Sequence, residues 1–224
     1  HIHIGEAKSG NIRAFRWHTG DIERVQWYNS DRPLAYDLSP YEETLLIDVD
    51  YLTFNNQLKG YFGGNHEFLC YDRVWDVTHT DSMKNDATMT LAGHPMLWAT
   101  VVYFRKCELA HRIFEMMKNI QTTWYYQSKF WGFSSRNYRN DFSLTLAHQL
   151  MQGYQQGTTF NHPLPSLSTM DTIYKVKDSE LLIKYMYNGS DNAVRIKDTN
   201  LHVMNKACLM DPEIRGELER YANV

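Results

Sequence analysis

The sequence lacks the features that mark several large classes of protein. No apolar run approaches the roughly 20 residues that a transmembrane helix needs, and no signal peptide is visible after His1. Internal repeats and low-complexity tracts are also missing. With 43% hydrophobic and 22% charged residues, the chain can form a full core. We therefore expect one globular domain covering residues 1–224.

Cysteine is scarce. Cys70, Cys107 and Cys208 are odd in number, lie far apart and form no CxxC pair. This spacing excludes a zinc site built from paired cysteines and favours reduced, mostly buried thiols. The expected location is the cytoplasm.

A strong excess of one charge is missing too. The formal net charge is -3, so the chain has no global electrostatic footprint for nucleic acid, although a local basic groove stays open. Several catalytic signatures are absent. There is no GxGxxG after a strand, no phosphate-cradling loop ending in Gly-Lys-Ser/Thr, no HExxH and no GxSxG.

The most informative pattern that is present runs from Thr44 to Leu52. An apolar, β-branched stretch ends in Asp48 and Asp50, which predicts a buried strand with carboxylates at its carboxyl end, where α/β sheets bind ligands. In a continuing strand the two would point to opposite faces, so both reach one cation only if the backbone turns after Asp48. Paired carboxylates suit a hard divalent cation and a phosphate-bearing substrate. The alternative is a strand that runs into an Asp-rich turn.

A third ligand is available near the other end of the chain. His202 lies in a short apolar stretch that reads as a strand, and Lys206 follows four residues later. An imidazole suits Mn²⁺, and an ammonium group suits a phosphate. The alternative is a structural, hydrogen-bonded histidine.

Hydrophobic periodicity predicts the remaining elements and an α/β fold class. Strands are expected over Glu67–Tyr71 and Leu97–Phe104, with a helix over Cys107–Ile120. Asp141 stands where the N-cap of a further helix would be, and Gly153 stands where that helix would end. Towards the carboxyl end, we expect a hairpin and a short charged helix at Ile173–Val176, Leu181–Tyr187 and Asp211–Tyr221.

The segment from Arg32 to Asp50 resembles the donor-site region of GT-A glycosyltransferases, in which a DxD motif follows an apolar strand. Such enzymes move a sugar from a nucleotide diphosphate. Three later segments resemble the glycogenin-like branch in the same order: Trp98–Phe104, Arg139–Asp141, and His202 with Lys206. The residues of Ser39–Tyr51 and of Arg139–Phe142 also resemble those of glycosyltransferase-like proteins of bacteriophages.

The resemblance implies a GT-A-like domain with a mixed, mostly parallel central sheet flanked by helices. It implies that Asp48, Asp50 and His202 hold Mn²⁺ or Mg²⁺. For the donor, the implied ligand is a nucleotide sugar, UDP-linked in the commonest case. The implied acceptor is a hydroxyl group, either of a hydroxymethylated base in phage DNA or of a glycan, in the cytoplasm of a bacterial host.

The same resemblance implies roles for further residues. Arg32 and Lys206 would contact the diphosphate or nucleotide, and Trp98 would line the sugar pocket. Asp141 would bind the sugar, or act as base toward the acceptor hydroxyl in an inverting enzyme. A basic and aromatic stretch that includes Lys129 and Arg136 fits a nucleic-acid acceptor or a solvated loop equally well.

Two departures from the family pattern matter. The sugar-pocket strand begins Trp98-Ala99-Thr100 where the glycogenin-like branch has Asn-Ala-Gly, so the choice between retaining and inverting chemistry stays open. Only 47 residues precede Asp48, whereas GT-A domains have about a hundred. Part of the base-binding half is therefore expected to be absent or compressed.

Two other functions remain as alternatives. A phosphatase of the haloacid-dehalogenase type also begins with an apolar strand and DxD, but it has a Thr where this chain has Leu52. A module that binds a sugar nucleotide without turning it over would share the same fold.

Overall fold

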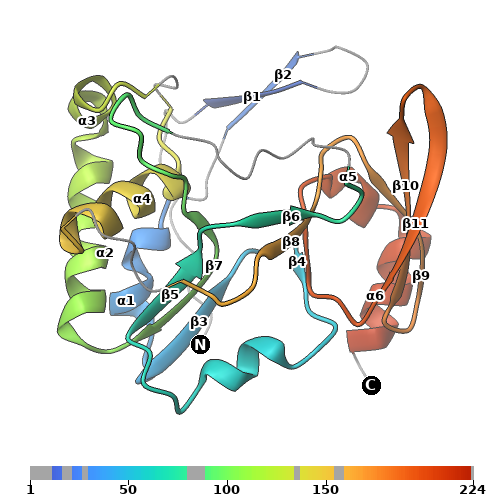
Figure 1. Ribbon diagram of the computed structural model, residues 1–224, viewed down its shortest axis with the longest axis horizontal. Coiled ribbons are helices and arrows are strands. Elements are labelled where there is room, and N and C mark those ends of the chain that lie inside the picture. The colour runs from blue at the N-terminus through green and yellow to red at the C-terminus, as the bar shows by residue number, and fades with distance from the viewer. Residues whose placement is uncertain are drawn as a thin grey trace. The chain divides into compact units, whose positions relative to one another are not determined.

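The structure is a computed structural model, and it describes residues 12–16, 22–26, 30–79, 89–133, 137–153 and 159–222 (Figure 1). Contacts divide the chain into two compact units, which are described separately. The first unit comprises His1–Leu46, Asn65–Asp72 and Asp86–Asn161. The second unit comprises Ile47–Gly64, Arg73–Asn85 and His162–Val224.

The first unit is built on a sheet of three strands in the order β3 (Glu43–Ile47), β7 (Trp98–Arg105) and β5 (Phe68–Tyr71). Strands β5 and β7 pair antiparallel, with Phe68 opposite Phe104. All six central residues of β7 are buried, as its unbroken apolar run requires. The predictions of strands at β5 and β7 are confirmed.

Helices α2 (Glu108–Thr122), α3 (Trp124–Phe130) and α4 (Asn140–Met151) complete the core of this unit. Helix α2 buries Ile113, Phe114, Met117 and Ile120, which recur at helical spacing. Burial of each such side chain contributes about 1.5–3 kcal/mol, so this stripe anchors the helix.

Shorter elements of the first unit precede its sheet. They are η1 (Arg32–Leu34), α1 (Ala35–Leu38), and the antiparallel pair β1 (Ile12–Arg16) and β2 (Ile22–Gln26).

The second unit contains a sheet of four short strands in the order β4 (Tyr51–Leu52), β12 (Leu201–Val203), β8 (Leu164–Leu167) and β6 (Val74–Asp76). Strand β8 pairs parallel with both β12 and β6, whereas β4 pairs antiparallel with β12. The carboxyl ends of β6, β8 and β12 therefore lie at the same edge of the sheet as the amino end of β4.

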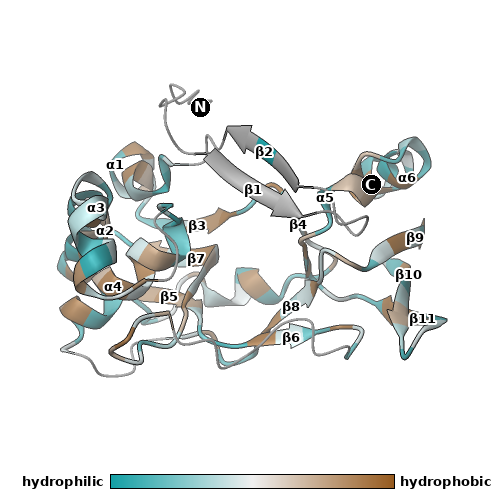
Figure 2. Ribbon diagram, turned by 90° about the horizontal axis from the view of Figure 1, so that it is seen from above, coloured by the Kyte–Doolittle hydropathy of each residue, from teal (hydrophilic) through white to brown (hydrophobic). Residues whose placement is uncertain are grey.

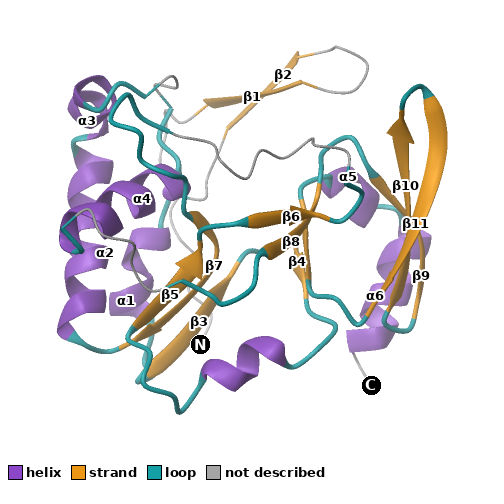
Figure 3. Cartoon of the chain, in the orientation of Figure 1, coloured by secondary structure: helices purple, strands orange, loops and turns teal. Residues whose placement is uncertain are grey.

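A second sheet in this unit consists of β9 (Thr172–Lys177), β10 (Glu180–Tyr187) and β11 (Ser190–Lys197), all antiparallel. Helix α6 (Pro212–Ala222) covers one face, as Figure 3 shows, and α5 (Lys206–Leu209) precedes it. The 3-10 helix η2 (Gln57–Tyr61) completes the unit. These elements confirm the predicted hairpin and carboxyl-terminal helix.

The expected mixed α/β class is confirmed, whereas the GT-A-like central sheet stays a prediction. The described strands form several small sheets, and the four-stranded one is mixed, with parallel β12–β8 and β6–β8 pairs and an antiparallel β4–β12 pair. Parallel neighbours need a long crossover, whereas two-residue connections such as Asn188-Gly189 between β10 and β11 join antiparallel strands. The expectation of one domain over residues 1–224 stays a prediction.

Candidate metal centre

The turn at Asp48-Val49-Asp50 is the centre of the candidate site. Strand β3 ends at Ile47, and the Tyr51 N–H donates to the Asp48 carbonyl at 3.1 Å. Val49, at the tip of the turn, is 99% exposed. The strand predicted over residues 44–52 is thus two strands separated by a turn. The condition for both carboxylates to reach one cation is met.

Pairing between β4 and β12 brings His202 beside this turn. Tyr51 lies opposite His202, and the Val203 N–H donates to the Asp50 carbonyl at 2.8 Å. Both Asp50 and His202 are buried, whereas Asp48 is half-buried. A carboxylate and an imidazole far apart in the sequence are therefore held together by backbone hydrogen bonds.

The possible ligand atoms of Asp48, Asp50 and His202 all lie within 4.8 Å of one another. The Asp50 Oδ1 and His202 Nε2 atoms are 3.8 Å apart, which is too long for a hydrogen bond. Two atoms that each bind one ion at about 2.1 Å are separated by at most about 4.2 Å. The three side chains therefore fit a divalent cation with shifts of a few tenths of an ångström.

Ser166 of β8 sets the orientation of the His202 ring. Its Oγ lies 3.3 Å from both the Nδ1 and the backbone carbonyl oxygen of His202. The single hydroxyl proton goes to the carbonyl, so the Ser166 oxygen accepts a hydrogen bond from Nδ1–H. This network assigns the tautomer whose Nε2 lone pair faces Asp50, which is the form a metal ligand requires.

Lys206, the first residue of α5, neutralises Asp50. Its ammonium group lies 2.9 Å from Asp50 Oδ2, and the lysine side chain is 68% exposed whereas that of Asp50 is 7% exposed. The two carboxylate oxygens therefore have different surroundings, since Oδ2 contacts a cation and Oδ1 faces the imidazole. The structure thus brings His202 and Lys206 beside Asp50, and their roles as metal and diphosphate ligands stay predictions.

Asn200 is a positioning residue that the sequence interpretation missed. Its side-chain carbonyl accepts the Phe54 and Asn55 backbone N–H groups at 2.8 and 3.0 Å, and its amide donates to the Asn55 side chain at 2.8 Å. Asn200 is only 3% exposed. This clamp fixes β12 against the chain that leaves β4, and it thereby fixes the separation of Asp50 and His202.

A second buried acidic pair was also missed. The Thr78 hydroxyl lies 2.8 Å from Asp76 Oδ1 and 2.9 Å from Asp171 Oδ2. The Thr78 N–H also donates to Asp76 Oδ1. One hydroxyl proton cannot serve two ionised carboxylates. Burial raises the pKa of Asp171, and the nearby Asp76 charge raises it further, so Asp171 holds its proton more tightly than an exposed aspartate does.

In the first unit, Asp141 is not the N-cap that the sequence predicted. Helix α4 begins at Asn140, so Asp141 lies inside the first turn and Arg139 holds the cap position. The carboxylate is used elsewhere, because Oδ1 accepts the Ala99 N–H at 3.0 Å and Oδ2 pairs with Arg139 at 3.0 Å. Asp141 thus joins α4 to β7, next to Trp98. Gly153, with a φ of +61°, follows the end of the helix as predicted.

The charges of Arg32 and Asp141 both affect the pKa of the Tyr138 phenol. Tyr138 is buried, which raises its pKa; the Asp141 charge raises it further and the Arg32 charge lowers it. Arg32 is 8% exposed, and Trp98 is half-buried. Arg32, Trp98 and Asp141 therefore belong to the first unit, whereas Lys206 and the predicted metal ligands belong to the second. Arg136 lies outside the described residues.

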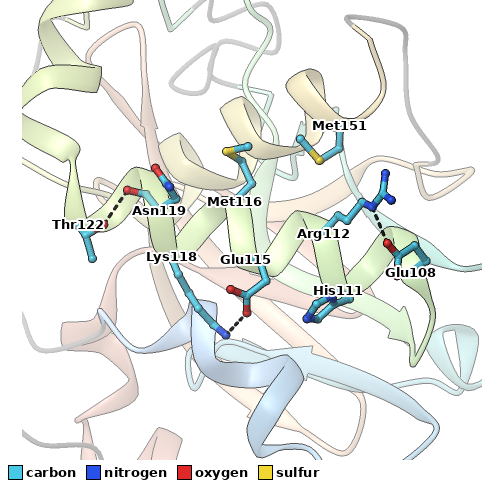
Figure 4. Close-up of a pocket in the computed structure, with 9 residues that line it drawn as sticks. All are labelled: Glu108, His111, Arg112, Glu115, Met116, Lys118, Asn119, Thr122 and Met151. Atoms are coloured by element: carbon cyan, nitrogen blue, oxygen red, sulfur yellow. Dashed lines mark hydrogen bonds and ion pairs between the residues drawn. The ribbon is translucent and has the colours of Figure 1, made fainter.

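A pocket of about 590 Å³ runs along α2 and contains none of the predicted site residues. Figure 4 shows that its charged side chains satisfy one another. Arg112 pairs with Glu108 at 2.6 Å, and Lys118 pairs with Glu115. This pocket offers no convergent polar groups for a ligand, and we assign no chemistry to it.

Comparisons with known proteins identify no family for this chain. No protein-family model, curated protein or solved structure matches it. Among the residues that the structure describes, no helix combines the length and apolar character that a membrane crossing requires. The resemblance to GT-A glycosyltransferases therefore stays a prediction from the sequence.

Proposed function

We propose that this protein is a metal-dependent glycosyltransferase that uses a nucleotide diphosphate sugar. The observation that carries the proposal is the convergence of Asp48, Asp50 and His202 within 4.8 Å, with the ammonium group of Lys206 on the same carboxylate. A cation site next to a mobile positive charge suits a pyrophosphate better than it suits a neutral ligand.

The chemistry of the donor set supports Mn²⁺ or Mg²⁺. Both ions prefer oxygen ligands, and the single imidazole favours Mn²⁺. When bound, the ion would neutralise charge that develops on the diphosphate leaving group. Asp48, Asp50 and His202 would hold it, and Ser166 would keep the Nε2 atom of His202 available.

Lys206 gives the site a way to couple metal and diphosphate binding. The lysine is paired with Asp50 while its side chain is largely exposed. A cation on Asp50 replaces the ammonium group as counter-charge, and the long stem lets the ammonium turn to a phosphate instead. Lys206 would then contact the pyrophosphate while Asp48, Asp50 and His202 hold the ion.

The remaining assignments follow the sequence resemblance. We propose a GT-A-like arrangement in which Arg32 contacts the nucleotide, Trp98 lines the sugar pocket and Asp141 contacts the transferred sugar. The donor is a UDP-sugar, and the acceptor is a hydroxyl group of a glycan or of a hydroxymethylated base in phage DNA. The two fixed contacts of Asp141 favour a positioning role over that of a general base.

Electron paramagnetic resonance of Mn²⁺ tests the metal centre directly, because bound ions lose the sharp signal of free ions. We expect the unmodified chain to bind one equivalent, and Asp50→Asn to bind none. Asp191→Asn is the matched control, since it removes an exposed carboxylate from the same unit. Equal Mn²⁺ binding by both variants would refute the assignment.

A second assay separates the three functions considered. With Mn²⁺ present, a UDP-sugar should raise the melting temperature further, as expected of a ligand that binds only the folded state. Slow release of UDP from the donor supports a transferase. Release of phosphate from an aryl phosphate supports the phosphatase alternative, and binding of the UDP-sugar without any product supports a non-enzymatic module.

A further inference from the structure

The sheet formed by β9, β10 and β11 has two unlike faces. One face buries Ile173, Leu181 and Ile183, and α6 packs on this side with Ile214 buried. Figures 1 and 2 show α6 on that side of the three strands. The opposite face is exposed, so its side chains are not needed for the core of the unit.

The strand register shows which side chains share the exposed face, because directly paired residues point the same way. Glu180 of β10 lies between Lys177 and Lys197, which belong to β9 and β11 respectively. In the next row, Leu182 lies between Lys175 and Arg195. Each of these two rows therefore carries a cation on both outer strands.

A third row has its cation on the middle strand. Lys184 follows Leu182 on the same face of β10, and its ammonium group lies 3.4 Å from the centre of the Tyr174 ring. Tyr174 sits at a register irregularity in β9 and is 56% exposed. An exposed aromatic ring therefore lies among the cations of this face.

The charge of this face is opposite to that of the whole chain. It carries five exposed cationic side chains and two carboxylates, Glu180 and Asp191, on a chain whose formal net charge is -3. Glu180 pairs with Arg195 at 3.3 Å. Lys175, Lys177 and Lys197 form no ion pair with another described residue. The five cations are Lys175, Lys177, Lys184, Arg195 and Lys197.

We propose that this face, the basic face of β9–β11, binds the phosphate backbone of a nucleic acid. Neighbouring strands lie about 4.8 Å apart and alternate residues about 6.7 Å apart, so the cations form a repeating array across three strands. Such an array fits a polymer with regularly repeated charges better than it fits a single small anion. Tyr174 adds a ring on which a base can stack.

The arrangement of apolar residues on this face argues for nucleic acid over a membrane surface. Binding in a bilayer interface requires a continuous apolar surface beside the cations. Here, Leu182 is half-buried between Lys175 and Arg195, and Met186 lies at the end of the strand. These two apolar side chains are separated and form no continuous apolar surface. The inference stands without the proposed glycosyltransferase activity, because it uses none of the metal ligands.

The test measures binding of a fluorescently labelled 20-base-pair DNA duplex to the full chain by anisotropy, between 50 and 200 mM salt. The logarithm of the binding constant should fall linearly with the logarithm of salt concentration, with a slope of about -4.5 if all five cations contact phosphates. The triple variant Lys175→Gln, Lys184→Gln, Arg195→Gln should reduce that slope by about 2 to 3.

The matched control removes three positive charges elsewhere, by Arg112→Gln, Arg215→Gln and Arg220→Gln. These exposed arginines each pair with a glutamate on their own helix. The control should keep the original slope. No binding of the duplex at 50 mM salt, or an equal loss in both triple variants, would overturn the proposal.

Two further arms identify the partner class. In one arm, vesicles of anionic lipid replace the DNA, and in the other, polyglutamate replaces it. Stronger binding of either one than of DNA overturns the nucleic-acid assignment. Mn²⁺ resonance is recorded on the same samples. Loss of DNA binding with intact Mn²⁺ binding in the Lys175/Lys184/Arg195 variant supports the proposal and separates it from the metal centre.

Discussion

A neutral histidine buried in the first unit makes the protein sensitive to acid. His148 of α4 is 1% exposed, and its ring centre lies 5.9 Å from that of Phe68. Its Nδ1 atom has no hydrogen-bond partner among the described residues. Burial lowers the pKa of His148 from 6.5 to about 4, because the charged ring would lose its water.

The sign of the effect follows from proton binding. The unfolded chain binds a proton at His148 near pH 6.5, whereas the folded chain does so only near pH 4. Stability is therefore complete above pH 6.5 and declines as pH falls from 6.5 to 4. The difference between the two pKa values corresponds to about 3 kcal/mol, of which about 2.5 kcal/mol is lost by pH 4.5.

Replacement of the ring by an apolar side chain tests this reasoning. We expect His148→Leu to remove most of the stability loss between pH 7 and pH 4.5 in urea unfolding followed by tryptophan fluorescence. Trp124 lies in the same core and reports the transition. His111→Gln, an exposed histidine on α2, is the control. Equal acid sensitivity of His148→Leu and the unmodified chain would refute the argument.

Three further predictions concern single side chains. Burial and Asp76 raise the pKa of Asp171, so its stabilising contribution is present at low pH and is lost as pH rises through that pKa. Asp171→Asn should therefore raise the urea midpoint at pH 7 and leave it unchanged at pH 3; a lower midpoint at pH 7 would contradict this. Gly132 has a φ of +69°, and a Cβ there would lie 2.5 Å from the Leu91 side chain. Gly132→Ala should cost about 1 kcal/mol in urea unfolding, although Leu91 is exposed and can shift; an unchanged midpoint would argue against strain. Lys206→Met should tighten Mn²⁺ binding, since it removes the cation that competes for Asp50, and should weaken binding of a UDP-sugar in calorimetry. Weaker Mn²⁺ binding would show that the lysine helps to build the metal site.

Local patterns in the sequence were sufficient to predict the helices and strands whose apolar residues recur at a regular spacing. The continuous apolar run of β7 and the helical stripe of α2 are read correctly, because burial of one face or both fixes the spacing of apolar residues. The start of α4 was missed by two residues, because the N-cap is Arg139 and not Asp141. Arg139 has an extended backbone and no capping side chain, so the sequence contained no signal for it.

The long-range contacts were beyond the reach of such patterns. The Asn200 clamp joins residues about 145 positions apart, and Ser166 contacts His202 across two parallel strands. Neither residue differs in type or spacing from ordinary polar positions in strands and loops. Which strands pair in the four-stranded sheet was not predicted for the same reason, since strand pairing depends on the whole chain.

The ion pair between Lys206 and Asp50 can be interpreted as a purely structural contact or as part of a metal centre. The two interpretations differ in what they require of His202. A purely structural pair needs only opposite charges, and it places no condition on the His202 tautomer. The structure nevertheless directs the Nε2 atom of His202 toward Asp50 at 3.8 Å while Ser166 engages Nδ1. A divalent cation between the imidazole and the carboxylate would bind both groups. This arrangement favours a metal centre over a structural ion pair.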